Sequence, residues 1–162
     1  MKTFCLHGAG GKASRRLVEG LFAPLLFSSS EESLGDASHF QLGGSSLAMT
    51  TDAFVVKPLT FPGGCIGELA VNGTVNDLAV SGARAETMVC TFILEAGLAT
   101  NVLEAQVQAM ADAARKAGVR IVAGDTKVVE HGKADGMYIT TTGVGRPLPG
   151  VCVSARSVRA GD

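Results

Sequence analysis

The sequence has few aromatic residues and no large excess of either charge. Tryptophan is absent, tyrosine occurs once, and 14 Lys and Arg balance 15 Asp and Glu to a net charge of −1. Nucleic acids are bound by basic surfaces and by stacking on aromatic rings, so this composition argues against a nucleic-acid partner. No apolar run approaches the ~20 residues of a membrane span, and the amino-terminal run is too short for a signal peptide. We therefore expect a cytoplasmic protein with no membrane partner.

Closely spaced cysteines are also missing. The chain has four, Cys5, Cys65, Cys90 and Cys152, and none forms a CxxC pair. Zinc sites show closer spacing, and disulfides are unusual in a reducing compartment. We expect reduced thiols, some of them core residues.

What the chain does contain is enough apolar material for one domain. It has 162 residues, 46% of them hydrophobic, with a mean hydropathy of +0.29. Periodicity predicts helices over 13–26, 65–81 and about 103–117, the last ended by Gly118. Apolar and β-favouring runs predict strands over 36–42, 47–52, 85–95, 119–124 and 136–145. Interleaved strands and helices indicate a mixed α/β fold.

The helix expected over 65–81 carries a costly polar stripe. Asn72, Gly73, Asn76 and Asp77 lie within an otherwise apolar pattern. Asn and Asp compete for backbone hydrogen bonds, and Gly costs roughly 0.5–1 kcal/mol relative to Ala in a helix. Such residues need a reason beyond helix formation.

Four aspartates lie in similar contexts with small neighbours. Three of them are at or near predicted strand ends, and the fourth projects from the polar helix; they are Asp36, Asp52, Asp125 and Asp77. If they converge, they form a hard oxygen site of the kind that holds Mg²⁺ against phosphates. The alternative for each one singly is a turn residue or a helix cap.

Two segments combine glycine with lysine. Gly8, Gly10, Gly11 and Lys12 precede a helix, where backbone N–H groups and the helix dipole suit an anion. This is not a Walker A loop, because Leu6 and Ala13 occupy two of its defining positions. The alternative is an ordinary flexible loop. In "GDTK", Lys127 offers a compact charge to a phosphate oxygen.

Five segments together resemble one family. "HGAGGK", "TTDAFVVKPLTFPGG", "IGELAVNGTVNDLAVSGA", "FILEAGL" and "GDTKVV" occur in this order, and over residues 4–145 the chain is similar to HypE hydrogenase maturation proteins. These belong with aminoimidazole ribonucleotide synthase, selenophosphate synthetase and thiamine monophosphate kinase. The resemblance implies an α/β (α+β) amino-terminal ATP-binding domain, residues 1–146. It has a mixed sheet with helices on one face and forms a homodimer through that sheet.

The resemblance also implies cofactors and site residues. The cofactors are ATP and Mg²⁺. Asn76 and Asp77 face the nucleotide, and the loop from Gly8 through Gly10 and Gly11 to Lys12 closes over the triphosphate. Lys127 contacts a phosphate. The metal-site carboxylates are Asp36, Asp52, Asp77 and Asp125.

The activity implied is that of a carbamoyl dehydratase. ATP activates a carbamoyl oxygen carried on a carboxy-terminal Cys, and loss of phosphate leaves a thiocyanate, the source of the cyanide ligand of [NiFe]-hydrogenase. The implied partners are other maturation factors, namely a carbamoyl donor protein and an iron-carrying scaffold.

The chain departs from this pattern in several places. Gly35, Lys57 and Cys65 replace more usual residues, and none of the four cysteines occupies the acceptor position. Residues 147–162 look like a linker toward a second domain, so we expect this chain not to complete the reaction alone. One alternative is a non-catalytic module for dimerisation and docking to maturation factors, and another is a small-molecule kinase of the same superfamily.

Overall fold

A computed structural model describes residues 10–27, 34–151, 153 and 157–161. The chain divides into two compact units, Met1–Leu34 and Gly35–Asp162.

The amino-terminal unit contains one helical run. It consists of α1 (Gly11–Leu17), a π-helical turn η2 (Val18–Phe22) and α2 (Ala23–Leu26). The helix predicted over 13–26 is therefore confirmed. The wider π turn ends two residues before Pro24, which has no N–H to continue an α-helical ladder. None of the helical residues is buried, and Leu25 is 75% exposed.

The second unit is built on a mixed sheet of five strands, ordered β1-β2-β7-β5-β6. Neighbouring strands are antiparallel except β5 and β6, which are parallel. The strands are β1 (Ser38–Leu42), β2 (Ser45–Phe54), β5 (Ala83–Glu95), β6 (Arg120–Val129) and β7 (Met137–Pro147). A small hairpin of β3 (Thr60–Phe61) and β4 (Gly64–Cys65) turns at Pro62 and Gly63, and Gly63 has a φ of 91°.

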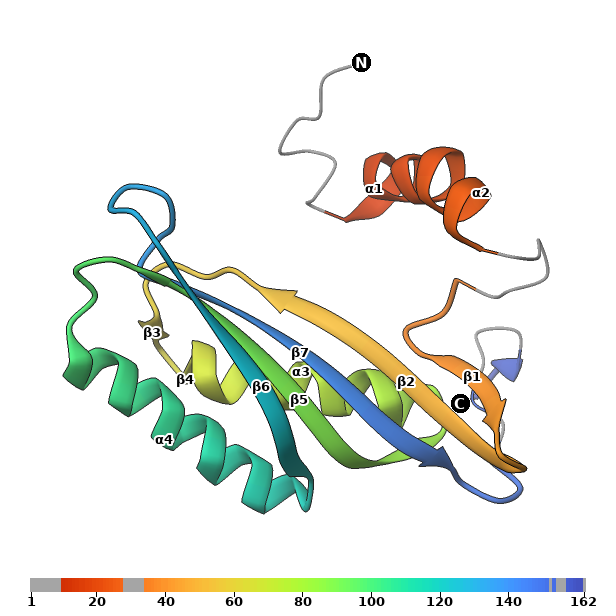
Figure 1. Ribbon diagram of the computed structural model, residues 1–162. Coiled ribbons are helices and arrows are strands. Elements are labelled where there is room, and N and C mark those ends of the chain that lie inside the picture. Colours follow the sequence, from red (N-terminus) through yellow and green to blue (C-terminus); the bar gives the residue numbers. More distant parts are fainter. Residues whose placement is uncertain (1–9, 28–33, 152, 154–156, 162) are drawn as a thin grey trace. The chain divides into compact units, whose positions relative to one another are not determined.

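Two helices, α3 (Ile66–Val80) and α4 (Thr100–Ala117), lie on the same side of this sheet (Figure 1). The core lies between them and the sheet, where Ile66, Leu78, Met88, Met137 and Ile139 are almost fully buried. Helix α4 connects the parallel pair and ends at Gly118, whose φ of 68° is the left-handed conformation expected there. The predicted fold class, a mixed sheet with helices on one face, is confirmed.

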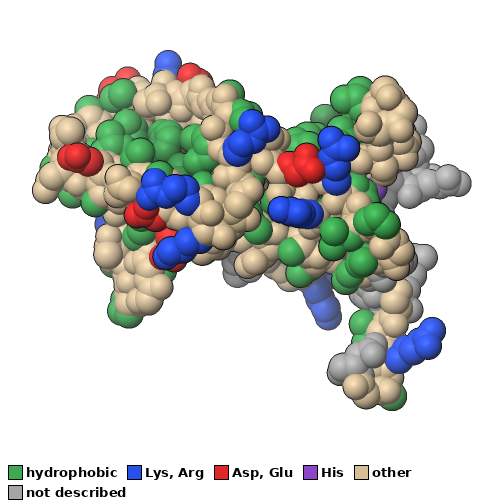
Figure 2. Space-filling model, turned by 90° about the horizontal axis from the view of Figure 1, so that it is seen from below, with side chains coloured by type: hydrophobic (Ala, Val, Ile, Leu, Met, Phe, Trp, Pro, Cys, Tyr) green, Lys and Arg blue, Asp and Glu red, His purple; other side chains and the backbone are tan. Residues whose placement is uncertain are grey.

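Among the residues of this unit that the structure describes, no helix covers the opposite face of the sheet. Alternation along the strands places Met49, Thr51, Val89, Thr91 and Ile93 on it. Met49 and Val89 are 42% and 38% exposed, whereas their neighbours on the helix-covered face are buried. Over the surface seen from below in Figure 2, hydrophobic side chains are interspersed with acidic and basic ones.

Strand β6 extends furthest beyond its predicted end. The strand expected over 119–124 continues to Val129, because its residues pair with β5 as far as Glu95. Asp125 therefore lies inside a strand and not at its end. The sequence misled here because the polar "GDTK" segment reads as a turn, while an edge strand tolerates polar residues.

The two cysteines among the described residues, Cys65 and Cys90, are both free thiols, and Cys90 is buried. Cys5 and Cys152 lie outside the described residues. Within the described ranges, no helix is long and apolar enough to span a bilayer.

Candidate functional site

Thr50 on β2 joins two of the predicted aspartates. Its hydroxyl lies 2.7 Å from the backbone carbonyl oxygen of Asp36 and 3.1 Å from Oδ2 of Asp77 on α3. Thr50 is 7% exposed. A hydroxyl has one proton to donate, so the two acceptors share it. The segment just before β1, the middle of β2 and α3 are thereby tied together at one point.

Asp52 lies on the same face of β2 as Thr50, because side chains two residues apart in a strand point to the same face. Its Oδ2 is directed at Gly73 of α3: a Cβ at Gly73 would lie 3.6 Å from it. Gly73 is one helical turn before Asp77, so both carboxylates stand between β2 and α3. The structure thus brings Asp52 and Asp77 together, and Asp36 lies near them with its backbone carbonyl oxygen bonded to Thr50.

The surroundings of Asp77 disfavour its charged form. Burial raises the pKa of Asp77, the carboxylates of Asp52 and Asp36 raise it further, and the hydrogen bond from Thr50 partly opposes the increase. Among the ion pairs of the described residues, none involves any of the three aspartates. The arrangement is one that a cation would relieve.

The composition of α3 now has a physical explanation. Gly73 is required because a Cβ there would lie 2.8 Å from the Phe54 ring. Thr74 is fully buried and shares a hydrogen bond with Thr141 of β7. Asn72 and Asn76 are exposed, one helical turn apart. The residues of the polar stripe therefore have different roles. Gly73 allows close packing, Asp77 supplies a carboxylate, and the exposed amides include Asn76, which was predicted to face the nucleotide.

Asp125 and Lys127 lie elsewhere in the chain. Both are exposed on the edge strand β6, at the opposite side of the sheet from β1. Their partners on β5 are Thr91 and Ile93, which belong to the face without helices. Within one chain, Asp125 is therefore separated from the other three aspartates both by strand order and by face.

The predicted glycine loop belongs to the amino-terminal unit. Gly8 lies outside the described residues. Gly10 and Gly11 have φ values of 77° and 67°, so a side chain at either would be strained, and Lys12 follows in the first turn of α1. The role of this loop toward a nucleotide stays a prediction.

The residues fit a metal held jointly with a nucleotide better than a metal held by protein alone. In the part of the chain that the structure describes, no three acidic, cysteine or histidine side chains gather closely enough to hold a metal ion. Mg²⁺ is commonly bound by one or two carboxylates together with water and substrate phosphates. Asp52 and Asp77 supply carboxylates of this kind.

Sequence reasoning missed Thr50 and Gly73 as determinants of this site. The signal for Thr50 was present, because it lies two residues before Asp52 and so shares its strand face. The signal for Gly73 was the unfavourable helix propensity of glycine. Only the structure shows the reason for it, which is that the Phe54 ring packs where a Cβ would lie.

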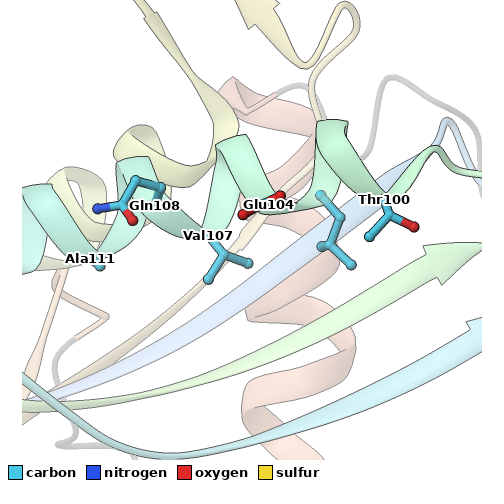
Figure 3. A pocket seen from close by; sticks show the side chains of 6 residues that line it. Thr100, Glu104, Val107, Gln108 and Ala111 are labelled. Carbon is cyan, nitrogen blue, oxygen red and sulfur yellow. The ribbon is translucent and has the colours of Figure 1, made fainter.

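A separate surface hollow runs along α4. It is lined by Leu103 and by the residues labelled in Figure 3, which include Thr100 and Val107 on one side of the helix. None of the predicted site residues contributes to it. The candidate site is therefore the aspartate cluster and not this hollow.

Comparison with known proteins gives a family match over residues 34–146, described as AIR synthase related protein, N-terminal domain. A carbamoyl dehydratase HypE from Azotobacter vinelandii is 50% identical over 157 residues, which cover 97% of this chain and 46% of the relative. The chain thus spans about half the length of the curated relatives it matches.

Solved structures give the same picture. A HypE–HypF complex contains a chain with 46% identity and a TM-score of 0.78, covering 88% of this chain and 46% of that one. A HypE structure in complex with ATP has 49% identity and a TM-score of 0.63, covering 91% of this chain and 44% of that one.

Proposed function

The chain belongs to the AIR synthase related family, and we propose that it is the ATP- and Mg²⁺-binding half of a HypE-type carbamoyl dehydratase. One observation carries the proposal: the carboxylates of Asp52 and Asp77 lie near each other between β2 and α3, where the buried hydroxyl of Thr50 contacts Asp77 and the backbone carbonyl oxygen of Asp36. A HypE relative of 49% identity has been crystallised with ATP, which supports the same ligand here.

Asp52 and Asp77 are the carboxylates that we assign to the metal, with Asp36 beside them. Bound Mg²⁺ would spread the charge of the transferring phosphoryl group. The hydroxyl of Thr50 holds one oxygen of Asp77 in place. Asn76, which directly precedes Asp77 on α3 and is exposed, is assigned to the nucleotide.

The remaining assignments extend the site. Lys127 contacts a phosphate, and the loop containing Gly8, Gly10, Gly11 and Lys12 closes over the triphosphate. Asp125 and Lys127 share the sheet face without helices, so we place their contribution within a dimer formed through that face. The apolar and threonine side chains of this face suit burial against a second copy.

The proposed reaction has two steps. The carbamoyl oxygen attacks the γ-phosphorus of ATP, and the bond from that phosphorus to the β-γ bridging oxygen breaks, releasing ADP. The carbamoyl nitrogen then loses its protons, the C–O bond breaks with departure of phosphate, and a C≡N bond forms. A phosphate leaves far more readily than an amide oxygen, which is the reason for using ATP. The residues assigned above act in the first step, where the transferring group carries negative charge.

Partners follow from the same assignment. A solved complex joins HypE to HypF, and we propose maturation factors as partners of this protein, namely a carbamoyl donor protein and an iron-carrying scaffold. We also propose that residues 1–162 bind ATP without completing the dehydration, because none of the four cysteines stands at the acceptor position expected from the family. Stoichiometric, carbamoyl-dependent ATP turnover by this chain alone would contradict that part.

Isothermal titration calorimetry with ATP and excess Mg²⁺ tests the main proposal. We expect saturable binding that falls strongly in Asp77→Asn and is unchanged in Glu104→Gln, a control on the exposed surface of α4. No heat at millimolar nucleotide would refute nucleotide binding and would favour the alternative, a non-catalytic dimerisation and docking module.

A further inference from the structure

Strand β6 is held on one side only. It is an edge strand whose sheet neighbour is β5, and all of its residues except Val129 are exposed. It nevertheless carries Asp125 and Lys127, two residues whose use in a binding site requires a fixed position. The relevant question is what holds the end of this strand.

Glu95, at the end of β5, supplies the answer. Its Oε2 accepts a hydrogen bond of 2.9 Å from the backbone N–H of Gly136, and its Oε1 accepts one from the N–H of Gly132. Its own N–H donates to the carbonyl oxygen of Gly136 at 2.8 Å. One side chain thus spans the connection between β6 and β7 and joins it to β5.

The ladder continues this attachment on both sides of Glu95. Glu95 pairs with Val129, the last residue of β6, and the N–H of Ala96 donates to the carbonyl oxygen of Val129 at 2.9 Å. Two residues earlier, Lys127 pairs with Ile93. A displacement of the connection would therefore be transmitted to Lys127 through only two residues of edge strand.

The carboxylate of Glu95 is in its charged form at neutral pH. The N–H groups of Gly132 and Gly136 lower its pKa, and the imidazole of His131, 3.4 Å from Oε1, acts in the same direction. Hydrogen bonds to a charged acceptor are about twice as strong as neutral ones. The side chain of Glu95 is 13% exposed, so these bonds are largely shielded from water.

A second attachment lies on the same connection. Asp135 pairs with Lys57 in the segment after β2, at 2.6 Å, but both side chains are well exposed. Exposed ion pairs contribute little, typically below about 1 kcal/mol. The shielded carboxylate of Glu95 is thus the stronger of the two.

We propose that Glu95 is a positioning residue for Lys127: by holding the β6–β7 connection, it fixes the end of the edge strand from which Lys127 reaches a phosphate. This inference rests on the proposed function, which assigns Lys127 to the nucleotide. Among the described residues Lys127 forms no ion pair, so its backbone is what locates its charge. Glu95 belongs to the "FILEAGL" segment at the end of β5, and positioning Lys127 is the role that we assign to it.

The test is a double-mutant cycle on the full chain. Affinity for ATP with excess Mg²⁺ is measured by calorimetry for wild type, Glu95→Gln, Lys127→Ala and the double variant, with Glu104→Gln as the matched control. We expect Glu95→Gln to weaken binding on the order of tenfold, as for other residues that orient a binding group. We expect no further loss when it is added to Lys127→Ala.

Hydrogen exchange provides a second readout. The amides of Gly132 and Gly136 are expected to exchange faster in Glu95→Gln than in wild type. If Glu95→Gln does not fold, Glu95→Asp replaces it, because it keeps the charge but is too short to reach both amides.

The outcomes separate the two proposals. Equal losses from Glu95→Gln with and without Lys127 would overturn the positioning role, as would faster exchange with unchanged affinity. Absence of ATP binding by wild type would overturn the proposed function itself, and this inference with it.

Discussion

Replacing Gly73 by Ala should destabilise the protein, although the same change stabilises most helices. In an exposed helix interior, Gly to Ala gains about 1 kcal/mol. Here the new Cβ would lie 2.8 Å from two atoms of the Phe54 ring. That is about 0.7–1.2 Å closer than carbon atoms pack at their optimal separation.

The magnitude follows from two opposing effects. Overpacking a core typically costs about 1–3 kcal/mol, which outweighs the helix-propensity gain of about 1 kcal/mol. We expect a net loss of about 1 kcal/mol, or a melting temperature about 2–4 °C lower. Because Phe54 is two residues beyond Asp52 on the same strand face, the shift should also weaken ATP binding in the presence of Mg²⁺.

Thermal unfolding followed by circular dichroism measures this effect without added nucleotide. Gly67→Ala is the more severe comparison, because its Cβ would lie 2.0 Å from the backbone carbonyl oxygen of Gln106, which cannot rotate away. Phe54→Leu introduced with Gly73→Ala should recover part of the loss by removing the ring. A melting temperature that rises in Gly73→Ala would refute the reasoning, since the helix-propensity gain would then exceed any strain.

Three further predictions concern single side chains. Without Mg²⁺, the variant Asp77→Asn should match or exceed the wild type in thermal stability, because burial and neighbouring carboxylates raise the pKa of Asp77 and disfavour its charge. The affinity of the variant for ATP should fall at least about tenfold. A lower melting temperature in the variant would contradict this reasoning. Hydrogen bonding lowers the pKa of Glu95 below its ordinary value of 4.5, so its stabilisation is complete above that pH and is lost as the pH falls through the lower, folded-state pKa. Denaturant titrations of wild type and Glu95→Gln should therefore converge in acid, and a constant difference down to pH about 2 would exclude the effect. Thr141→Val should lower the free energy of unfolding by about 1–3 kcal/mol, because it leaves the buried hydroxyl of Thr74 without its partner. Chemical denaturation should show that the double variant Thr74→Val/Thr141→Val recovers part of this stability. Additive losses of stability from the two substitutions would contradict the account.

Much of the fold was readable from local pattern. The stripe from Leu103 to Ala117 with Gly118 after it has one physical solution, an amphipathic helix with a left-handed cap, and α4 has that form. The apolar run over 85–95 likewise became β5. These predictions succeeded because periodicity and capping act over a few residues.

Register was beyond local pattern. Asp125 was expected near a strand end because "AGDTK" has the residues of a turn, yet pairing with Thr91 of β5 keeps it inside β6. An edge strand has one free side and tolerates polar residues, so composition does not reveal its length. The face on which Asp125 lies depends on that register.

The sequence by itself determined the helices, most strands, the family resemblance and the kind of chemistry, because residue types and their spacing carry that information. Tertiary structure alone decided which carboxylates meet. Asp52 on β2 and Asp77 on α3 lie near each other, and the hydroxyl of Thr50 joins Asp77 to the backbone of Asp36, while Asp125 faces the other side of the same sheet. Convergence depends on long-range strand pairing and helix packing, and no local pattern contains those distances.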